Sequence, residues 1–122
     1  MQRIGLIVDD MFFASKIAGA AERAGSKIER IKSLADIDLL ATDPPALVII
    51  DLNSDRLDPI QAIESLKSRP DLSRVPVVGF VSHVQVDLIR RAEAAGCDHV
   101  VPRSKFTQLL AEIVSGNLAS LR

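Results

Sequence analysis

Largely apolar runs of strand length, separated by stretches of helical composition, constrain the fold of this chain more than any other feature. The clearest runs cover residues 4–8, 47–50 and 77–81. Strands that helices cover on both faces are apolar throughout instead of alternating, and they are typical of parallel sheets. The alternation of such runs with helical stretches therefore predicts an α/β domain built on a parallel sheet.

Local signals divide the chain into five strands and five helices. Asp58 followed by Pro59 is typical of a helix start, and Gly25 and Gly96 are typical of helix ends. Ser82 with Gln85 three residues later resembles a capping box. Ser33 and Ser104 are expected to cap two further helices. The expected strands cover residues 3–8, 27–31, 46–51, 77–81 and 100–101.

We expect these elements to form one domain over residues 1–122, with the strand order 2-1-3-4-5. Right-handed crossovers limit the arrangements that such a chain can adopt. This order gives a doubly wound, flavodoxin-like fold, α/β in class. Ligands of such sheets bind at the carboxyl ends of the strands, where the winding reverses between the first and third strands.

Charge and hydropathy exclude several classes of partner. Lys and Arg number 15 against 16 Asp and Glu, a formal net charge of −1. The chain therefore lacks the basic excess of a nucleic-acid-binding protein. Its apolar runs are far shorter than a membrane span, and its single cysteine, Cys97, fits a reducing compartment. We expect a cytoplasmic protein without a nucleic-acid or membrane partner.

Three carboxylates fall at the predicted ligand crevice. Asp9 and Asp10 end the first strand, and Asp51 ends the third. A single acid at a strand end is usually a solvated turn residue, but this grouping favours a functional site. Three carboxylates close together repel one another, so a proton or a cation must offset their charge. Mg²⁺ suits oxygen ligands of this kind.

The sequence at residues 8–10, 49–53, 75–77 and 95–98 reads Val-Asp-Asp, Ile-Ile-Asp-Leu-Asn, Val-Pro-Val and Ala-Gly-Cys-Asp. In these motifs and their spacing the chain resembles the response-regulator receiver domain over essentially its whole length. The resemblance implies that Asp51 accepts a phosphoryl group from a histidine kinase or phosphotransfer protein in a two-component phosphorelay. It implies Mg²⁺ on Asp10, Asp51 and the Asn53 carbonyl, with Asp9 acting through water.

The resemblance further implies a phosphoprotein that signals, and no enzyme beyond its own phosphorylation and dephosphorylation. The chain ends soon after the fifth predicted helix, so we expect either that its output passes through a downstream protein partner or that the chain is a fragment of a longer protein. A homodimer stays open.

The sequence departs from the receiver pattern in the loop after Asp51, at Ser54, Asp55 and Pro59, and at three further positions. Val81 falls where receivers have Thr or Ser, and Val100 falls where they have an aromatic residue. Arg103 falls where they have Lys. It keeps the positive charge and can hold phosphate with two N–H groups, but it is bulkier and flatter. A phosphate contact and a solvated loop arginine stay open for Arg103.

Three functions compete. The intact acids favour a phosphoryl-accepting receiver, whereas the departures favour a degenerate receiver that docks partners without phosphate. A small enzyme or cofactor binder is disfavoured, because no G-x-G-x-x-G or phosphate-binding loop follows the first strand. Of Phe12 and Phe13, which follow the acidic pair, we expect one in the core and the other exposed beside the site.

Overall fold

A computed structural model describes residues 2–122, which form one five-stranded parallel sheet with the order β2-β1-β3-β4-β5. Every pairing in it is parallel. The predicted doubly wound order is confirmed. The strands are β1 (Gln2–Ile7), β2 (Ser26–Arg30), β3 (Leu47–Asp51), β4 (Val77–Val81) and β5 (His99–Pro102).

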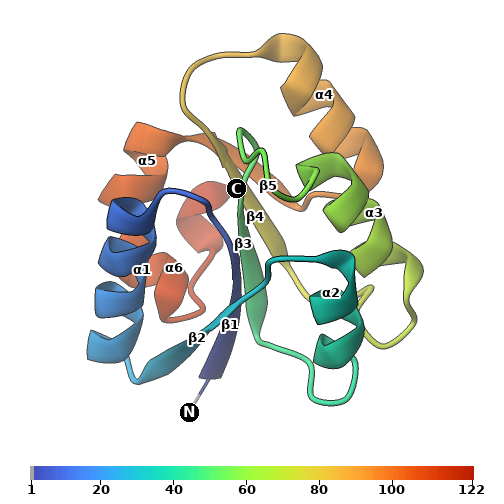
Figure 1. Ribbon diagram of the computed structural model, residues 1–122. Helices are drawn as coiled ribbons and strands as arrows, with labels where there is room; N and C mark the ends of the chain where they lie inside the picture. Colours follow the sequence, from blue (N-terminus) through green and yellow to red (C-terminus); the bar gives the residue numbers. More distant parts are fainter. Residues whose placement is uncertain (1) are drawn as a thin grey trace.

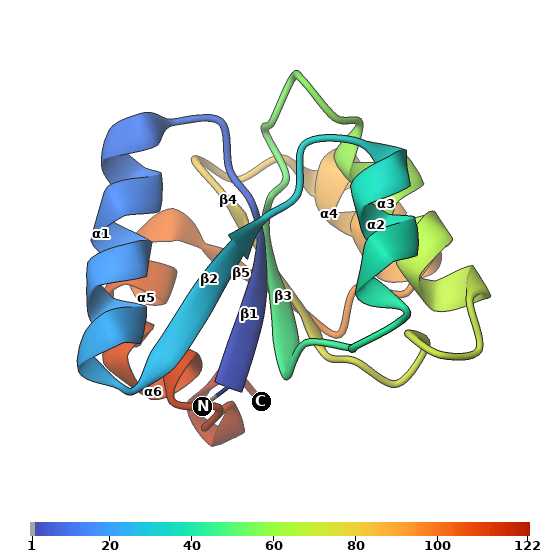
Figure 2. The same ribbon diagram turned by 60° about the horizontal axis from the view of Figure 1, so that its bottom comes forward.

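Helices cover both faces of the sheet. Figures 1 and 2 show α1, α5 and α6 on one face and α2, α3 and α4 on the other. Their bounds are α1 (Met11–Arg23), α2 (Leu34–Leu40), α3 (Pro59–Ser68), α4 (Val86–Ala95), α5 (Arg103–Gln108) and α6 (Leu110–Val114), followed by the 3₁₀ turn η1 (Ala119–Leu121). Within residues 2–122, no helix combines the length and the apolar character needed to cross a membrane.

Side-chain caps start several helices at the predicted places. Ser33 caps α2 by accepting the Asp36 N–H, and Asp58 caps α3 by accepting the N–H groups of its first turn. Gly25 and Gly96 follow α1 and α4 with φ of 77° and 109°. Only glycine adopts this left-handed conformation without strain.

Two predicted caps are wrong. Helix α4 begins at Val86, and Ser82 donates its backbone N–H to the Asn53 side chain instead of capping a helix. The predicted cap Ser104 lies inside α5, whose N-cap is Pro102. The last predicted helix is also interrupted at Leu109, where φ is −100° and ψ is 10°.

The core forms one apolar layer on each side of the sheet. On the α1 side, Phe13, Phe80 and Phe106 form an aromatic cluster, with ring centroids 5.2 Å apart for Phe13–Phe80 and 4.6 Å apart for Phe80–Phe106. Phe12, by contrast, is 92% exposed. This confirms the expectation that one of the two adjacent phenylalanines is in the core and the other at the surface.

We predict that Phe80→Ala lowers the free energy of unfolding by about 3–5 kcal/mol, because it removes a fully buried ring and leaves a cavity in the aromatic cluster. Urea unfolding followed by circular dichroism measures the loss, since the chain has no Trp or Tyr. The control is Phe12→Ala at the exposed neighbour, for which we expect a change within about 0.5 kcal/mol. Equal losses in both variants contradict this account of the core.

Candidate functional site

The pairing of β1 with β3 brings the predicted acids to one edge of the sheet. Ile7 lies opposite Ile50, so the two strands end side by side. Asp51 closes β3, and Asp9 and Asp10 follow β1. The three side chains differ in exposure: Asp51 is buried at 7% exposed, Asp9 is half-buried and Asp10 is exposed.

Asp51 is held by its own loop. Its Oδ1 accepts the backbone N–H of Asn53 at 2.8 Å. Burial raises the pKa of this carboxyl, while the Asn53 N–H and the charge of Arg103 oppose that rise. The neighbouring charges of Asp9 and Asp10 act in the same direction as burial. Asp51 is thus a desolvated carboxylate in an acidic cluster.

Asp10 has two partners within the protein. Its Oδ1 caps α1 by accepting the N–H groups of Phe12 and Phe13 at 2.9 and 3.2 Å. Its Oδ2 lies 3.3 Å from Nη2 of Arg103. The Phe13 N–H and then the Arg103 contact hold the pKa of Asp10 below its usual value, against an opposing effect of desolvation.

Arg103 also lies on an aromatic face. Its guanidinium carbon is 3.9 Å from the centroid of the Phe13 ring, which is a cation–π contact. The arginine therefore contacts a carboxylate through Nη2 and an aromatic ring through its flat face, and its predicted phosphate contact stays a prediction. Its side chain lies between Asp10 and the aromatic cluster.

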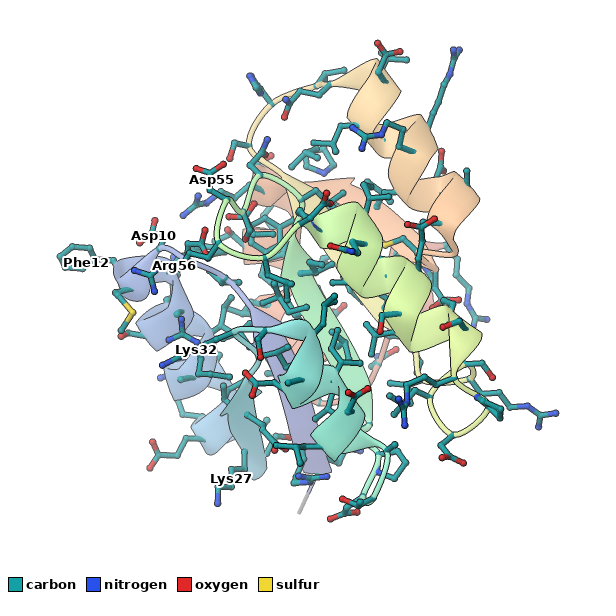
Figure 3. The ribbon with its side chains drawn as sticks, turned by 45° about the vertical axis from the view of Figure 1, so that its right-hand side comes forward. Asp10, Phe12, Lys27, Lys32, Asp55 and Arg56 are labelled. Atoms are coloured by element: carbon teal, nitrogen blue, oxygen red, sulfur yellow. The ribbon has the colours of Figure 1, made fainter. Side chains whose placement is uncertain are left out.

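Asp9 joins the two loops of the site. Its Oδ2 accepts the backbone N–H groups of Asp55 and Arg56 at 2.8 and 3.2 Å. Figure 3 shows Asp55 and Arg56 beside Asp10, with Phe12 projecting outward from the start of α1. Asp9 therefore fastens the β3–α3 loop to the end of β1.

Asn53 connects the site to the segment before α4. Its Oδ1 accepts the Ser82 N–H at 2.9 Å, and its Nδ2 donates to Oε1 of Gln85 at 2.6 Å. The capping-box pattern placed Ser82 and Gln85 in a local contact with each other. Their polar groups instead meet a residue about thirty positions earlier in the chain.

The donor set fits a hydrated Mg²⁺ with two carboxylates better than one with three. Among residues 2–122, no group of three His, Cys, Asp or Glu residues is arranged to hold a metal ion. Both oxygens of Asp10 have partners. The hydrogen bonds to Asp9 and Asp51 use only one oxygen of each within the part of the chain described. Mg²⁺ is often bound by one or two carboxylates and several waters, and the predicted ligand roles stay predictions.

The positions that depart from the receiver pattern offer no hydroxyl or aromatic ring. Val81 is buried in the core, and Val100 packs half-buried against the same cluster. Sequence reasoning missed two participants, Gln85 as a partner of Asn53 and Phe13 as a partner of Arg103. The only available signals were the polar side chain before a helix and the aromatic residue after the acidic pair.

We predict that Asp51→Asn is more stable than the wild type at neutral pH, because it removes a charge that burial disfavours. A raised native pKa means that the wild type is relatively most stable below the ordinary Asp pKa. It loses that stability as the pH rises through the raised value. The advantage of the variant should therefore vanish in acid. Unfolding free energies measured across this pH range check the sign.

The matched control for this measurement is Asp55→Asn, which neutralises an exposed carboxylate in the same loop. We expect no comparable gain at neutral pH. A variant Asp51→Asn that is less stable than the wild type at every pH contradicts the assignment of Asp51 as a desolvated charge.

The solved structures that are similar to this chain share its fold but little of its sequence. No protein-family model matches the sequence, and no curated protein matches it. A phosphorylated cyanobacterial phytochrome response regulator, RcpA, matches with a TM-score of 0.75 and 20% identity, covering 98% of this chain and 93% of that one. The receiver of a DNA-binding response regulator from Colwellia psychrerythraea matches with a TM-score of 0.77 and 26% identity, covering 93% and 95%.

A third solved structure is the receiver domain of the Pseudomonas aeruginosa sensor histidine kinase PA1611, with magnesium coordinated in its active-site cleft. It matches with a TM-score of 0.75 and 14% identity, covering 93% of this chain and 97% of that one. These similarities run over nearly the whole length of each chain. The chain therefore has the fold of a response-regulator receiver domain.

Proposed function

We propose that this chain is a cytoplasmic receiver whose Asp51 accepts a phosphoryl group from the phosphohistidine of a histidine kinase or phosphotransfer protein. The observation that carries the proposal is the buried Asp51 carboxylate at the end of β3, which uses one oxygen to accept the Asn53 N–H. Its neighbours Asp9, Asp10 and Arg103 supply both signs of charge. The output passes to a protein partner.

The transfer requires little covalent chemistry from the protein. An Asp51 oxygen forms a bond to phosphorus, and the bond from phosphorus to the donor imidazole nitrogen breaks. That nitrogen leaves with its electron pair. Such transfers depend on positioning and on stabilising the charge of the phosphoryl oxygens. The Asn53 N–H orients the carboxylate. In the later dephosphorylation, a water oxygen forms a bond to phosphorus and the bond from phosphorus to Asp51 breaks. Inorganic phosphate leaves, and the Asp51 carboxylate is restored.

Mg²⁺ is the proposed cofactor, and when bound it supplies positive charge to the phosphoryl oxygens. Asp9, Asp51 and the backbone carbonyl of Asn53 would hold it. Asp10 would join them only after its Oδ2 leaves Arg103. The magnesium in the Pseudomonas aeruginosa receiver supports the choice of ion.

Arg103 has a second role in this proposal. Once it leaves Asp10, its guanidinium can donate two N–H groups to a phosphoryl oxygen pair. The charge of Arg103 already opposes the rise that burial causes in the pKa of Asp51, so the guanidinium acts on the phosphoacceptor electrostatically. Release of Arg103 from Asp10 therefore frees the Asp10 carboxylate for the metal and the guanidinium for the phosphoryl group.

The alternative function is a degenerate receiver that binds its partner without phosphate. Val81 favours it, because a buried valine cannot donate a hydrogen bond to a phosphoryl oxygen. The ion pair between Asp10 and Arg103 favours it as well, because this contact offsets part of the acidic charge without a metal.

We predict a mass gain of one phosphoryl group when the protein is incubated with acetyl phosphate and Mg²⁺. Asp51 is the attacking group, so Asp51→Asn should abolish the gain, and chelation of Mg²⁺ should abolish it in the wild type. Intact mass spectrometry measures both. A folded wild type that gains no mass from acetyl phosphate or from a phosphorylated histidine phosphotransfer domain contradicts the proposal and favours the docking module.

We further predict that Arg103→Gln binds Mg²⁺ more tightly than the wild type, by up to about five-fold, because an exposed ion pair is worth about 1 kcal/mol or less. Removing the guanidinium frees Asp10 for the metal. Isothermal titration calorimetry measures the two affinities. The control is Lys105→Gln, which removes an equal charge from an exposed residue of the same helix. Tighter binding in both variants points to overall charge and contradicts a specific role for Arg103.

A further inference from the structure

Within residues 2–122, Asn53 is the residue of the β3–α3 loop that has hydrogen bonds both to the Asp51 side chain and to the segment leading to α4. Its backbone N–H donates to Asp51 at 2.8 Å. Its side chain accepts the Ser82 N–H at 2.9 Å and donates to Gln85 at 2.6 Å. Any change in the hydrogen bond to Asp51 therefore acts on the same residue that holds residues 82 and 85.

The segment of residues 82–85 depends on this side chain. His83 and Val84 between the two contacts are exposed. Gln85 is the N-cap of α4, but its side chain makes no capping hydrogen bond because it contacts Asn53. In the part of the chain that the structure describes, the side chain of Asn53 supplies both hydrogen bonds that join this segment to the β3–α3 loop.

Helix α4 buries fewer residues than its neighbour α3, which is of the same length and buries four. Ala92 is its only buried residue in the described chain, whereas Leu88 and Ile89 are half-buried and Val86 is 53% exposed. An open cleft of about 490 Å³ lies against the first turn, between Val86 and Arg91. Figure 1 shows the loop of residues 82–85 that carries the chain from β4 to this helix. Elements with few buried apolar contacts open at low free-energy cost.

We propose that Asn53 couples the charge of Asp51 to the start of α4 through Gln85. A hydrogen bond to a carboxylate is stronger than one to a neutral oxygen. When Asp51 loses its charge, the hydrogen bond from the Asn53 N–H to Asp51 weakens. Asn53 is then less well fixed in position, and its hydrogen bond to Gln85 weakens as well. The first turn of α4 then opens more often. This route needs neither a hydroxyl at residue 81 nor an aromatic ring at residue 100.

The inference rests on the proposed function for its natural trigger. A phosphoryl group on one oxygen of Asp51 turns the other oxygen from a carboxylate into an uncharged acyl oxygen, while the phosphoryl group carries its own negative charge. The coupling itself is a property of the unmodified chain, and Asp51→Asn neutralises the side chain without any phosphoryl transfer. The coupling and the phosphoryl transfer are therefore tested by separate measurements.

The experiment measures amide hydrogen exchange at Ile89, whose N–H donates to the Gln85 carbonyl at 2.9 Å and so reports opening of the first turn. It compares the wild type, Asp51→Asn, Gln85→Leu and the double variant. We expect exchange about five-fold faster in Asp51→Asn than in the wild type, the factor that one modest hydrogen bond represents. The Gln85→Leu background lacks the acceptor, so Asp51→Asn should change nothing there.

Two control variants separate coupling from general disturbance of the loop. Gln85→Glu keeps an acceptor oxygen at the same reach, so the response to Asp51→Asn should persist. His83→Ala removes an exposed side chain of the same segment, and the response should persist there too. Exchange at Ile49 in the centre of β3 tests whether opening is local to α4.

An unchanged Ile89 exchange rate in Asp51→Asn overturns the inference, as does a response of equal size in the Gln85→Leu background. The acetyl phosphate assay reports on the other proposal independently. Phosphorylation of Asp51 without the exchange response supports Asp51 as the phosphoacceptor and contradicts the coupling. The exchange response without phosphorylation supports the coupling and contradicts the assignment of Asp51 as the phosphoacceptor.

Discussion

The parallel pairing of β1 with β3 is the constraint on which the charged site depends. Because their carboxyl ends lie side by side, the acids that follow β1 and the acid that closes β3 must share one small region. Fully buried apolar residues fix this pairing from both faces, such as Leu6 on the α1 side and Ile50 on the opposite side. The repulsion among the acids is offset by local donors, namely backbone N–H groups and one guanidinium.

Each acid in this region has a different partner, and this gives the three carboxylates different properties. Asp10 is held by the start of α1 and by Arg103, and its pKa is lowered. Asp9 is held by the backbone of the β3–α3 loop. Asp51 has the deepest position and a single backbone donor, and its pKa rises. Identical residue types thus acquire separate roles from their neighbours.

The fold could be predicted from the sequence because its signals are local and repeated. Apolar runs marked the strands, and caps such as Asp58 are read within one helical turn. One error arose where a distant residue competes for a local group. Ser82 and Gln85 matched a capping box, but the Asn53 side chain binds both of them. Arg103 likewise depends on Asp10 and Phe13, which no pattern around residue 103 contains.

The contact between Asp10 and Arg103 also bears on how the site assembles during folding. Its two residues are 93 positions apart, so it belongs to the most non-local contacts of the domain. Such a contact requires closure of the long stretch of chain between its two residues, at a cost in chain entropy. The three carboxylates lie at the ends of β1 and β3, whereas Arg103 follows β5 at the edge of the sheet. In any partly unfolded form from which β5 is detached, the acidic site therefore lacks this counter-charge.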